Sequence, residues 1–457
     1  MSRPAVGIVH LGIGAFFRAF GVPWLEEAMA AGGGDWGVLG VSLRSASVRD
    51  ALAARDFAYH ALETGPDGAK ARRIEALRGV LVAPDDPKAV VAVMADPRVS
   101  LVTLTVTEKG YCHLPATGRL DAAHPAVMHD LASPEAPETA PGFIVAAMAR
   151  RRAAGLRPFT CLSCDNLPGN GEVLRAVVLD LARRLDPALA EWIAAEARFP
   201  CSMVDRIVPA TVPADVDAVE ALTGARDAGV VVHEPFRQWV IEDDFVDGLR
   251  PGLQTVGVQM VADVAPFEQM KLRCLNGTHS AIAYLGVLAG KATVSGAVAD
   301  PAFARFVEGV WRDEIVRSFV APAGVDLADY TAALMARYRN PAIEHKTIQI
   351  AMDGSQKLPQ RILATMADRL AVGGDIDGLA LVIAAWVHFL RGDGWEVNDP
   401  LAGPLQAAAL GDAPVRDVLA LREVFAETLA CDIYPAVQQG YDAIAAQGVQ
   451  TVLEGWT

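Results

Sequence analysis

The sequence predicts a doubly wound α/β domain followed by a mostly α-helical domain, and three observations support this. Short apolar or β-branched runs alternate with helical patterns in the first part of the chain, which implies a parallel sheet wound on both faces. From near residue 265 onward, Pro and Gly separate successive helical patterns. The 457 residues, 52% of them hydrophobic, suffice for two or three cores. We therefore divide the chain into 1–265 and 266–457.

Individual elements follow from the same patterns. The expected strands of the parallel sheet are the runs 6–11, 36–43, 101–106 and 159–164. Helical patterns between them cover 87–94 and 142–154, and those of the second part cover 302–320, 327–338, 361–371 and 379–390. No internal repeat interrupts this order.

Charge and hydropathy exclude several classes of function. The formal net charge of -15 argues against a nucleic-acid partner, because phosphate binding needs clustered Lys and Arg. It leaves a small anionic substrate open. The start, MSRPAVGIVHLGIG, has no secretory pattern, and the apolar run 379–390 is too short to span a bilayer. We expect a cytoplasmic protein that has no membrane partner.

The six cysteines are scattered along the chain. Cys161 and Cys164 form a CxxC pair, but the sequence has no second ligand pair and no thioredoxin-like context. Their position in a strand explains them better than zinc or redox chemistry. No Cys/His cluster has the spacing of a zinc site, so we expect no metal.

A glycine-containing loop follows the first strand and opens a helix. It reads Gly12-Ile13-Gly14-Ala15-Phe16-Phe17-Arg18, and we take Gly12 to Phe16 as candidate cofactor-binding residues. In a strand–GxG–helix turn, backbone N–H groups approach a pyrophosphate. Phe17 replaces the usual third glycine, so a purely structural turn is the alternative.

The end of the second strand bears on cofactor choice. An acid that binds the ribose hydroxyls belongs here, yet the sequence Gly40-Val-Ser-Leu-Arg44-Ser-Ala-Ser47 has no carboxylate before Asp50. Arg44 is suited to a 2′-phosphate. These residues leave NAD and NADP open.

A polar constellation marks the junction of the two parts. Lys271, Asn276 and His279 fall within an arc of about 140° on an α-helix, although a junction helix with a surface lysine would show the same spacing. Oxidation of an alcohol needs a base, and burial makes a lysine suitable. An Asn amide supplies a donor for the developing alkoxide. Asn166, just after a predicted strand, is a second such donor or part of an Asx turn.

These segments resemble the polyol-specific long-chain dehydrogenase family, which includes mannitol 2-dehydrogenase and fructuronate reductase (mannonate oxidoreductase). The resemblance runs almost from end to end of the chain. It is carried by GIGAFFR, LTVTEKGY, SCDNLPGNG, MVDRIVP, EPFRQWV, the KxxxxNxxH set and DGSQKLP. It implies an N-terminal Rossmann-type domain, a helical C-terminal domain, NAD(H) or NADP(H) without a catalytic metal, and a monomer, with a weak homo-oligomer left open.

The resemblance also implies residue roles that spacing alone does not show. Lys271 would be the general base, Asn166 and Asn276 the oxyanion hole, and His279 the group that orients the substrate. The remaining implied residues are Asp205 at a substrate hydroxyl, Lys357 in the pocket, and Glu108 and Glu268 in a proton relay.

Two departures from the mannitol enzymes are informative. Ala46 and Ser47 stand where those enzymes carry acidic residues, and Gln349 stands where they carry an Arg. The segment 345–361 is more similar to the mannonate/fructuronate branch. On a helix expected to begin near Leu358, Lys357 would lie at the N-terminal end and Arg361 one turn further, which favours an anion over the alternative of a solvated basic face.

The resulting expectation is an NAD-dependent, metal-independent secondary-alcohol dehydrogenase that interconverts D-mannonate and D-fructuronate. A mannitol 2-dehydrogenase or related polyol dehydrogenase is the alternative within the family. From a different class, a cofactor-binding sensor without catalysis stays open, but the intact set of Lys271, Asn166, Asn276 and His279 counts against it.

Overall fold

The computed structural model describes residues 3–114, 117–342 and 344–456. Contacts within the chain divide it into two compact units, Met1–Ala265 and Pro266–Thr457. They are called the N-terminal unit and the helical unit below.

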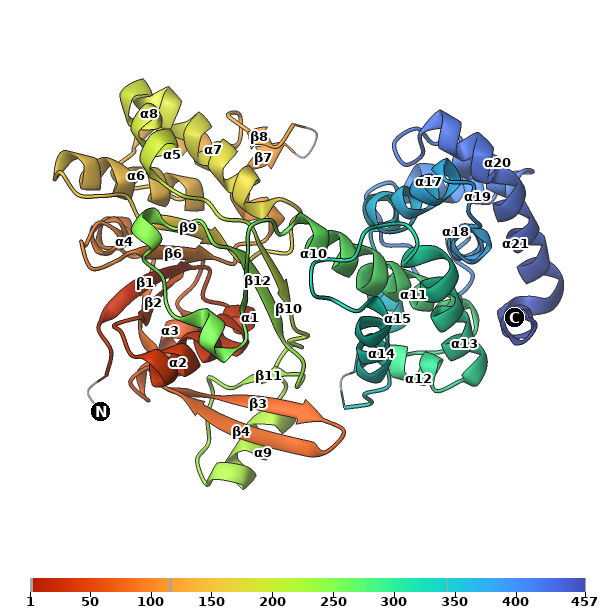
Figure 1. Ribbon diagram of the computed structural model, residues 1–457, viewed down its shortest axis with the longest axis horizontal. Helices are drawn as coiled ribbons and strands as arrows, with labels where there is room; N and C mark the ends of the chain where they lie inside the picture. The colour runs from red at the N-terminus through yellow and green to blue at the C-terminus, as the bar shows by residue number, and fades with distance from the viewer. Residues whose placement is uncertain (1–2, 115–116, 343, 457) are drawn as a thin grey trace. The chain divides into compact units, whose positions relative to one another are not determined.

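The N-terminal unit is built on a five-stranded parallel sheet (Figure 1). Its order is β5-β2-β1-β6-β9, formed by Leu77–Val82, Gly37–Ser42, Val6–Leu11, Leu101–Leu104 and Thr160–Ser163. Counted along the chain, these five strands have the order 3-2-1-4-5 of a Rossmann fold. The predicted doubly wound sheet is confirmed. The strand order runs outward in opposite directions on the two sides of the β1–β6 pair, so the carboxyl ends of β1 and β6 flank the crevice where such folds bind ligands.

Both faces of this sheet are covered, which explains why its strands read as continuous apolar runs. Val9, Leu11 and Val102 belong to a core cluster with residues of α4 (Pro87–Met94), α6 and α7. Ile8 and Leu162 belong to a second cluster with residues of α1 and α2. The other helices of the unit are α1 Ala15–Ala19, α2 Gly21–Gly32, α3 Ser47–Ala53, α5 Pro125–Ala132, α6 Ala140–Ala153, α7 Asn170–Leu185, α8 Pro187–Glu196 and α9 Pro213–Thr223.

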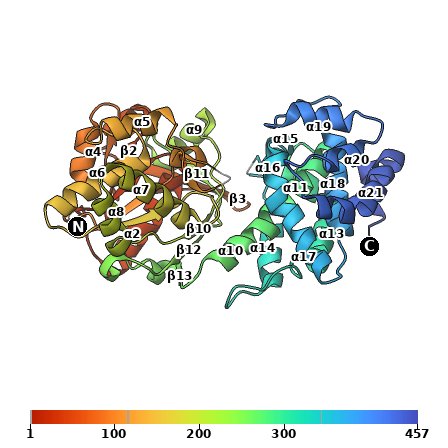
Figure 2. The same cartoon turned by 90° about the horizontal axis from the view of Figure 1, so that it is seen from above.

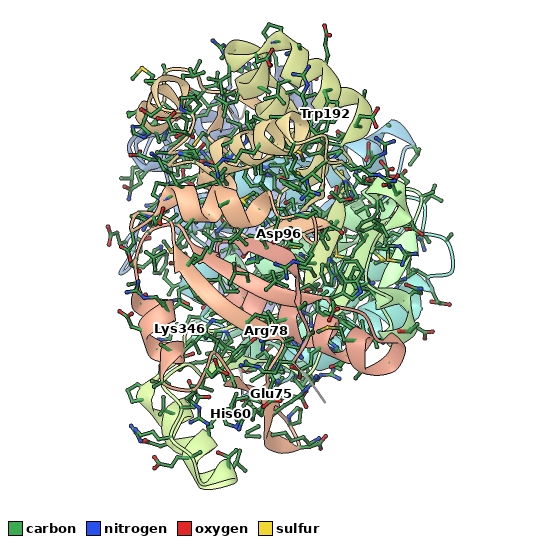
Figure 3. All side chains as sticks on the ribbon, turned by 90° about the vertical axis from the view of Figure 1, so that its left-hand side faces the viewer. His60, Glu75, Arg78, Asp96, Trp192 and Lys346 are labelled. Carbon is green, nitrogen blue, oxygen red and sulfur yellow. The ribbon has the colours of Figure 1, made fainter. Side chains whose placement is uncertain are left out.

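Three smaller sheets complete the N-terminal unit, and the sequence patterns did not predict them. Their orders are β10-β12-β13, β11-β3-β4 and β7-β8. Their strands are β3 Tyr59–Gly65, β4 Gly68–Ile74, β7 His113–Leu114, β8 Arg119–Leu120, β10 Ser202–Asp205, β11 Val231–His233, β12 Gln238–Glu242 and β13 Gln259–Val261. Trp192 on α8 and His60 on β3 lie at opposite ends of this unit (Figure 3).

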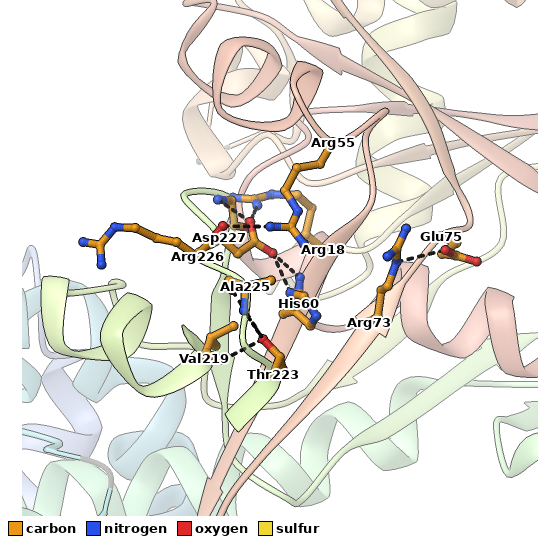
Figure 4. Close-up of polar contacts among 11 residues, drawn as sticks. Arg18, Arg55, His60, Arg73, Glu75, Val219, Thr223, Ala225, Arg226 and Asp227 are labelled. Carbon is orange, nitrogen blue, oxygen red and sulfur yellow. Dashed lines mark hydrogen bonds and ion pairs between the residues drawn. The ribbon is translucent and has the colours of Figure 1, made fainter. Parts of the chain in front are cut away.

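A buried carboxylate, Asp227, bonds to His60 within one of these sheets, between β3 and the segment before β11 (Figure 4). His60 Nδ1 lies 2.9 Å from the Asp227 carboxylate, which also accepts the backbone N–H of Gly229. Arg18 donates to the carbonyl of Gly229 at 2.6 Å. Arg18, the last residue of the GIGAFFR segment, therefore connects α1 to the segment that precedes β11.

The helical unit is centred on α18 (Asp377–Phe389), which packs against α11 (Thr278–Leu288) and α21 (Glu427–Glu454) and lies between them in Figure 2. Nearly every residue of α18 is buried, as expected for the apolar run 379–390. The remaining helices are α10 Ala265–Met270, α12 Val294–Val298, α13 Pro301–Val310, α14 Leu327–Tyr338, α15 Thr347–Ile350, α16 Gly354–Leu358, α17 Ala364–Ala371, α19 Ala402–Ala409 and α20 Pro414–Leu419.

Three π-helical turns interrupt the α-helices of this unit. They are η4 (Lys271–Gly277), η5 (Trp311–Ile315) and η6 (Pro359–Leu363). The helices predicted at 302–320 and 361–371 were too regular: the first ends in η5, and the second begins within η6. Such turns occur often at functional sites.

Candidate functional site

The glycine loop lies at the carboxyl end of β1. Gly12 has φ 90°, and a Cβ there would lie 2.2 Å from the carbonyl oxygen of Thr105, so both the backbone conformation and the close approach require glycine. Ile13 is buried against Gly40, where a Cβ would meet it at 2.6 Å. Gly14, exposed, precedes the first residue of α1.

One part of the loop packs into the interior, and another part exposes its backbone. Ala15 and Phe16, the first residues of α1, are half-buried. The exposed backbone around Gly14 fits the close approach of a pyrophosphate, as the sequence predicts.

The missing third glycine has a packing explanation. Phe17, which takes its place, is fully buried and stacks on His10 with ring centroids 3.5 Å apart. Burial lowers the pKa of His10 to about 3, so this imidazole is neutral at physiological pH. It contacts the hydroxyls of Thr103 and Thr105 at 2.7 and 2.8 Å, which fixes the ends of β1 and β6 relative to each other.

The turn after β2 offers hydroxyl groups and one exposed cation. Arg44 is exposed, and Ser45 Oγ lies 3.0 Å from Ser47 Oγ. The first carboxylate, Asp50, is already on α3, where it pairs with Arg49. Arg44 thus lies in the turn that joins β2 to α3, as expected.

The loops after β6 and β9 are joined by a buried carboxylate. Asp165 accepts the backbone N–H groups of Val106 and Thr107 at 3.0 and 2.8 Å, and the Tyr111 hydroxyl at 2.8 Å. Burial raises the pKa of Asp165 above its ordinary value. The sequence analysis treated Asp165 only as part of a turn. Its position directly before Asn166 is the feature that could have identified it.

Three predicted site residues therefore lie at strand ends of the N-terminal unit. Asn166 is exposed and follows Asp165, while Glu108 is exposed at the start of the short helix η1 (Glu108–Tyr111). Asp205 is the last residue of β10 and is buried. The loops that carry Asn166 and Glu108 are the pair that Asp165 holds together.

The remaining predicted catalytic residues lie on one stretch of the helical unit. Glu268 is on α10, Lys271 and Asn276 are on η4, and His279 is on α11. The expected α-helical arc is wrong for this stretch, because η4 is a π-turn. In a π-helix residue i pairs with i+5, so Asn276 lies about one turn above Lys271 and nearer its side than on an α-helix. Lys271 is only 8% exposed.

His279 is the centre of a cationic region of the helical unit. Its Nε2 is buried and has no hydrogen-bond partner among the described residues. Its ring lies 4.8 Å from Tyr338 and 5.0 Å from His345, centroid to centroid. Burial lowers the pKa of His279 well below its ordinary value, and four neighbouring cationic groups lower it further: His345, Arg337, Arg361 and Lys271. Burial lowers the pKa of His345 as well. A neutral imidazole with a buried, unused nitrogen is suited to a substrate hydroxyl.

The two other predicted substrate contacts lie on one continuous helix. The helix expected to begin near Leu358 begins at Gly354 and continues through η6 and α17, so Lys357 lies in its first turn and Arg361 one turn further. Its ammonium donates to the carbonyl of Met352 at 2.6 Å and lies 3.7 Å from the Asp353 carboxylate. The predicted start is four residues too late, because the helix runs from α16 into η6 without a break at Pro359.

Arg361, on η6, is half-buried beside the catalytic stretch. Its Nη1 lies 3.3 Å from Ser280 Oγ and 3.4 Å from the Asn276 carbonyl. Burial lowers the pKa of its guanidinium. Within the described part of the chain, no carboxylate forms an ion pair with Arg361. Sequence reasoning did not find Arg337, the further cation near His279, because nothing in the spacing of α14 distinguishes it from a surface arginine.

Other classes of site find no support among residues 3–114, 117–342 and 344–456. No group of three or more His, Cys, Asp or Glu side chains could hold a metal ion. Cys161 and Cys164 are buried free thiols in or directly after β9, as their strand position predicts. None of the helices described is both long enough and apolar enough to cross a membrane.

Comparison with known proteins agrees with this architecture. Residues 6–254 match the mannitol dehydrogenase Rossmann domain, and residues 263–445 match the mannitol dehydrogenase C-terminal domain. The D-mannonate oxidoreductase of Escherichia coli (strain K12) is 40% identical over 98% of this chain and 95% of its own length. The oxidoreductase YeiQ of the same organism is 43% identical over 98% and 93%.

A solved structure gives the same result. The Pseudomonas fluorescens mannitol 2-dehydrogenase, in a ternary complex with NAD and D-mannitol, aligns with a TM-score of 0.85 and 38% identity over 99% of this chain and 94% of that one. The sequence-based resemblance is confirmed. With both of its domains matched in order, this chain belongs to the mannitol dehydrogenase family of oxidoreductases.

Proposed function

We propose that this protein interconverts a sugar acid and its keto form, D-mannonate and D-fructuronate, with NAD as the cofactor. The observation that carries the proposal is the half-buried guanidinium of Arg361 beside His279, without a carboxylate partner among the described residues. A buried cation is costly unless an anion pairs with it, and a substrate carboxylate is such an anion. The similarity to D-mannonate oxidoreductase supports the same substrate class.

The glycine loop would hold the cofactor. The backbone around Gly12 to Phe16 would bind the pyrophosphate, and Arg44 would lie near the ribose. NAD, which the Pseudomonas fluorescens relative binds, supplies the hydride acceptor when bound. The fit rests on Gly12, where a side chain would collide with Thr105, and on the exposed backbone of Gly14.

Lys271 would remove the hydroxyl proton of the substrate alcohol. The i→i+5 pairing of η4 supports a role for Asn276 on the same side of the helix, where its amide would donate to the developing alkoxide. His279 would orient the substrate through Nε2, which is buried and has no protein partner among the described residues. The roles of Asn166 and Asp205 at the substrate, and of Glu108 and Glu268 in proton transfer, follow from the family resemblance.

Arg361 would bind the substrate carboxylate, and Lys357 would line the pocket. A guanidinium can form two parallel bonds to a carboxylate, and Arg361 uses only Nη1 in the described contacts. The Lys357 ammonium is already engaged by backbone carbonyls and Asp353, which leaves it a smaller part in anion binding.

A mannitol 2-dehydrogenase activity is the second candidate. The observation in its favour is the 38% identity to the Pseudomonas fluorescens enzyme that binds D-mannitol. A neutral polyol would leave Arg361 without an anion, and this is the physical reason to rank it second.

A screen of NADH oxidation separates the two. The purified protein is tested with fructuronate, tagaturonate, fructose and xylulose, and kcat/KM is compared across them. The proposal expects fructuronate to be reduced with a much higher kcat/KM than fructose. Equal or better activity on fructose would establish the second candidate instead, and no NADH oxidation with any substrate would favour a cofactor-binding protein without catalysis.

A further inference from the structure

The π-turn η4 receives hydrogen bonds from outside its own backbone. Where i→i+4 pairing changes to i→i+5, carbonyl groups lose their α-helical partners and must find others. Three consecutive carbonyls of η4, those of Cys274, Leu275 and Asn276, each accept a bond from a side chain. Since Cys274 and Leu275 are buried, water is a poor substitute for these donors.

Thr278 and Ser280 of the adjoining α11 donate locally to these carbonyls, and three further donors come from other elements of the helical unit. Trp311 Nε1, on η5, donates to the Cys274 carbonyl at 2.9 Å. The Tyr338 hydroxyl, at the end of α14, donates to the Leu275 carbonyl at 3.0 Å. Arg361, on η6, donates to the Asn276 carbonyl at 3.4 Å. The first two are the shorter bonds, and both come from neutral side chains.

Trp311 and Tyr338 are themselves held firmly. Trp311 is 2% exposed and Tyr338 is 3% exposed, and their rings stack with centroids 5.9 Å apart. Tyr338 also lies 2.8 Å from the Thr278 hydroxyl, which donates to Cys274. The Thr278 and Tyr338 hydroxyls donate their single protons to the Cys274 and Leu275 carbonyls, so Trp311, Tyr338 and Thr278 form one brace of donors on the buried side of η4.

Gly277 allows η6 to approach the same turn. A Cβ at this position would lie 3.1 Å from the Arg361 carbonyl oxygen, tighter than ordinary packing. The end of η4 is therefore fixed by a close backbone contact on one side and by the Trp311–Tyr338 brace on another.

We propose that Trp311 and Tyr338 are positioning residues, which set the geometry of catalysis by holding η4 in its π-register. Lys271 and Asn276 lie on this turn, so its register decides whether the ammonium and the amide face one reacting centre. Without the Trp311 and Tyr338 donors, only the local Thr278 hydroxyl would still bond the buried Cys274 and Leu275 carbonyls. These carbonyls would then favour i→i+4 bonds, which rotate Asn276 away from Lys271. This inference rests on the proposed roles of Lys271 and Asn276.

The test uses Tyr338→Phe, which keeps the ring and removes the donor, and Trp311→Phe, which keeps an aromatic side chain and removes the donor. The matched control is Trp24→Phe, because Trp24 is buried and its Nε1 has no partner among the described residues. The intact enzyme and each variant are assayed with NADH and with fructuronate and fructose in parallel. Hydrogen exchange of the peptide that covers η4 reports its register independently of turnover.

We expect kcat to fall about 10- to 100-fold in both η4 variants, with KM for NADH nearly unchanged, because small misplacements of reacting groups are costly. The pH midpoint of kcat should shift with them, and amide exchange in η4 should rise. The control should match the wild type in all of these. Unchanged exchange in η4, or raised exchange with normal kcat, would overturn the proposal.

Failure of this inference is distinguishable from failure of the proposed function. If Lys271→Ala keeps its turnover, Lys271 is not the base and the proposed function fails. If Lys271→Ala is inactive while Trp311→Phe and Tyr338→Phe turn over normally, only the positioning role is overturned. Should Trp311→Phe not fold, Tyr338→Phe decides the matter, because its hydroxyl lies on the same brace.

Discussion

At the scale of single residues, the proton-transferring group is the sharpest assignment. Lys271→Ala should lower turnover by at least ~10²-fold, the lower end of what a positioned acid–base group supplies. NADH affinity should hardly change, because the glycine loop and not the lysine would bind the pyrophosphate. Steady-state kinetics and NADH fluorescence titration measure the two effects. Lys88→Ala, an exposed lysine on α4, is the control, and near-normal turnover of Lys271→Ala would refute the assignment.

Arg361 and Lys357 separate two ways of recognising a carboxylate. Arg361→Met should reduce kcat/KM for fructuronate by about 10- to 100-fold more than for fructose, the effect of losing one hydrogen bond to a charged group. Lys357→Met should change this ratio less, since its ammonium is bonded to Met352 and Asp353. The same four-substrate assay measures both. A larger effect at Lys357 than at Arg361 would return anion recognition to the lysine.

The contrast between these two residues shows what the sequence could and could not predict. The sequence indicated that Lys357 and Arg361 belong near a substrate, and the structure places Arg361 beside Asn276 and Ser280. The sequence could not show that the Lys357 ammonium already bonds to two backbone carbonyls and lies beside Asp353. A side chain's hydrogen-bond partners depend on tertiary contacts that periodicity does not contain.

At the scale of elements, the turn between β2 and α3 decides the cofactor. We expect NADH to be used with a higher kcat/KM than NADPH, because Arg44 is one exposed cation in this turn and the next arginine, Arg49, is already paired with Asp50 and Asp85. Parallel assays with the two cofactors measure the preference, and Arg44→Ala shows whether the cation contributes. A clear NADPH preference that Arg44→Ala removes would show that Arg44 binds the 2′-phosphate.

The helices and strands that pattern alone predicted well are those with one simple cause. α4 and α14 begin and end at the predicted residues, because each has an apolar face and a side-chain cap, Asp86 and Asp326 respectively. η4 could not be predicted, since its i→i+5 bonds depend on donors from Trp311 and Tyr338. An α-helix with 3.6 residues per turn therefore predicts too large an angle between Lys271 and Asn276 around the helix axis.

At the scale of the whole molecule, the fold class followed from strand and helix alternation because a parallel sheet buried on both faces leaves a strong apolar signal. The three small sheets lacked such a signal. β11 and β13 have three residues each, and β4 is largely exposed, so neither length nor alternation separates them from loops.

Stability of the helical unit should depend on the ionisation of Glu314. This carboxyl, on η5, accepts the backbone N–H groups of Gly378 and Leu379 at the start of α18, at 2.6 and 2.9 Å. Burial raises its pKa to about 7. An acid whose pKa is raised on folding stabilises the folded state fully below its unfolded pKa, and this stabilisation is lost as pH rises toward 7.

The free energy of unfolding of Glu314→Gln should therefore depend on pH differently from that of the wild-type protein. The wild-type value minus the variant value should fall between pH 5 and pH 7.5, by at most about 1.4 kcal/mol per pH unit. Urea denaturation at three pH values measures it, and the subtraction removes the contribution of other groups such as His10. A difference that grows with pH would mean that the ionised carboxylate is the better cap for α18.

The brace on η4 also determines the stage of synthesis at which the geometry around Lys271 can form. Lys271 leaves the ribosome before Trp311, Tyr338 and Arg361, whose side chains bond the carbonyls of η4. Until those segments have folded onto it, the nascent stretch has only local partners, and these favour an ordinary α-helix. A partly made polypeptide therefore carries the lysine without the geometry that would make it reactive. The geometry of η4 is complete only when the last of these three side chains has bonded its carbonyl.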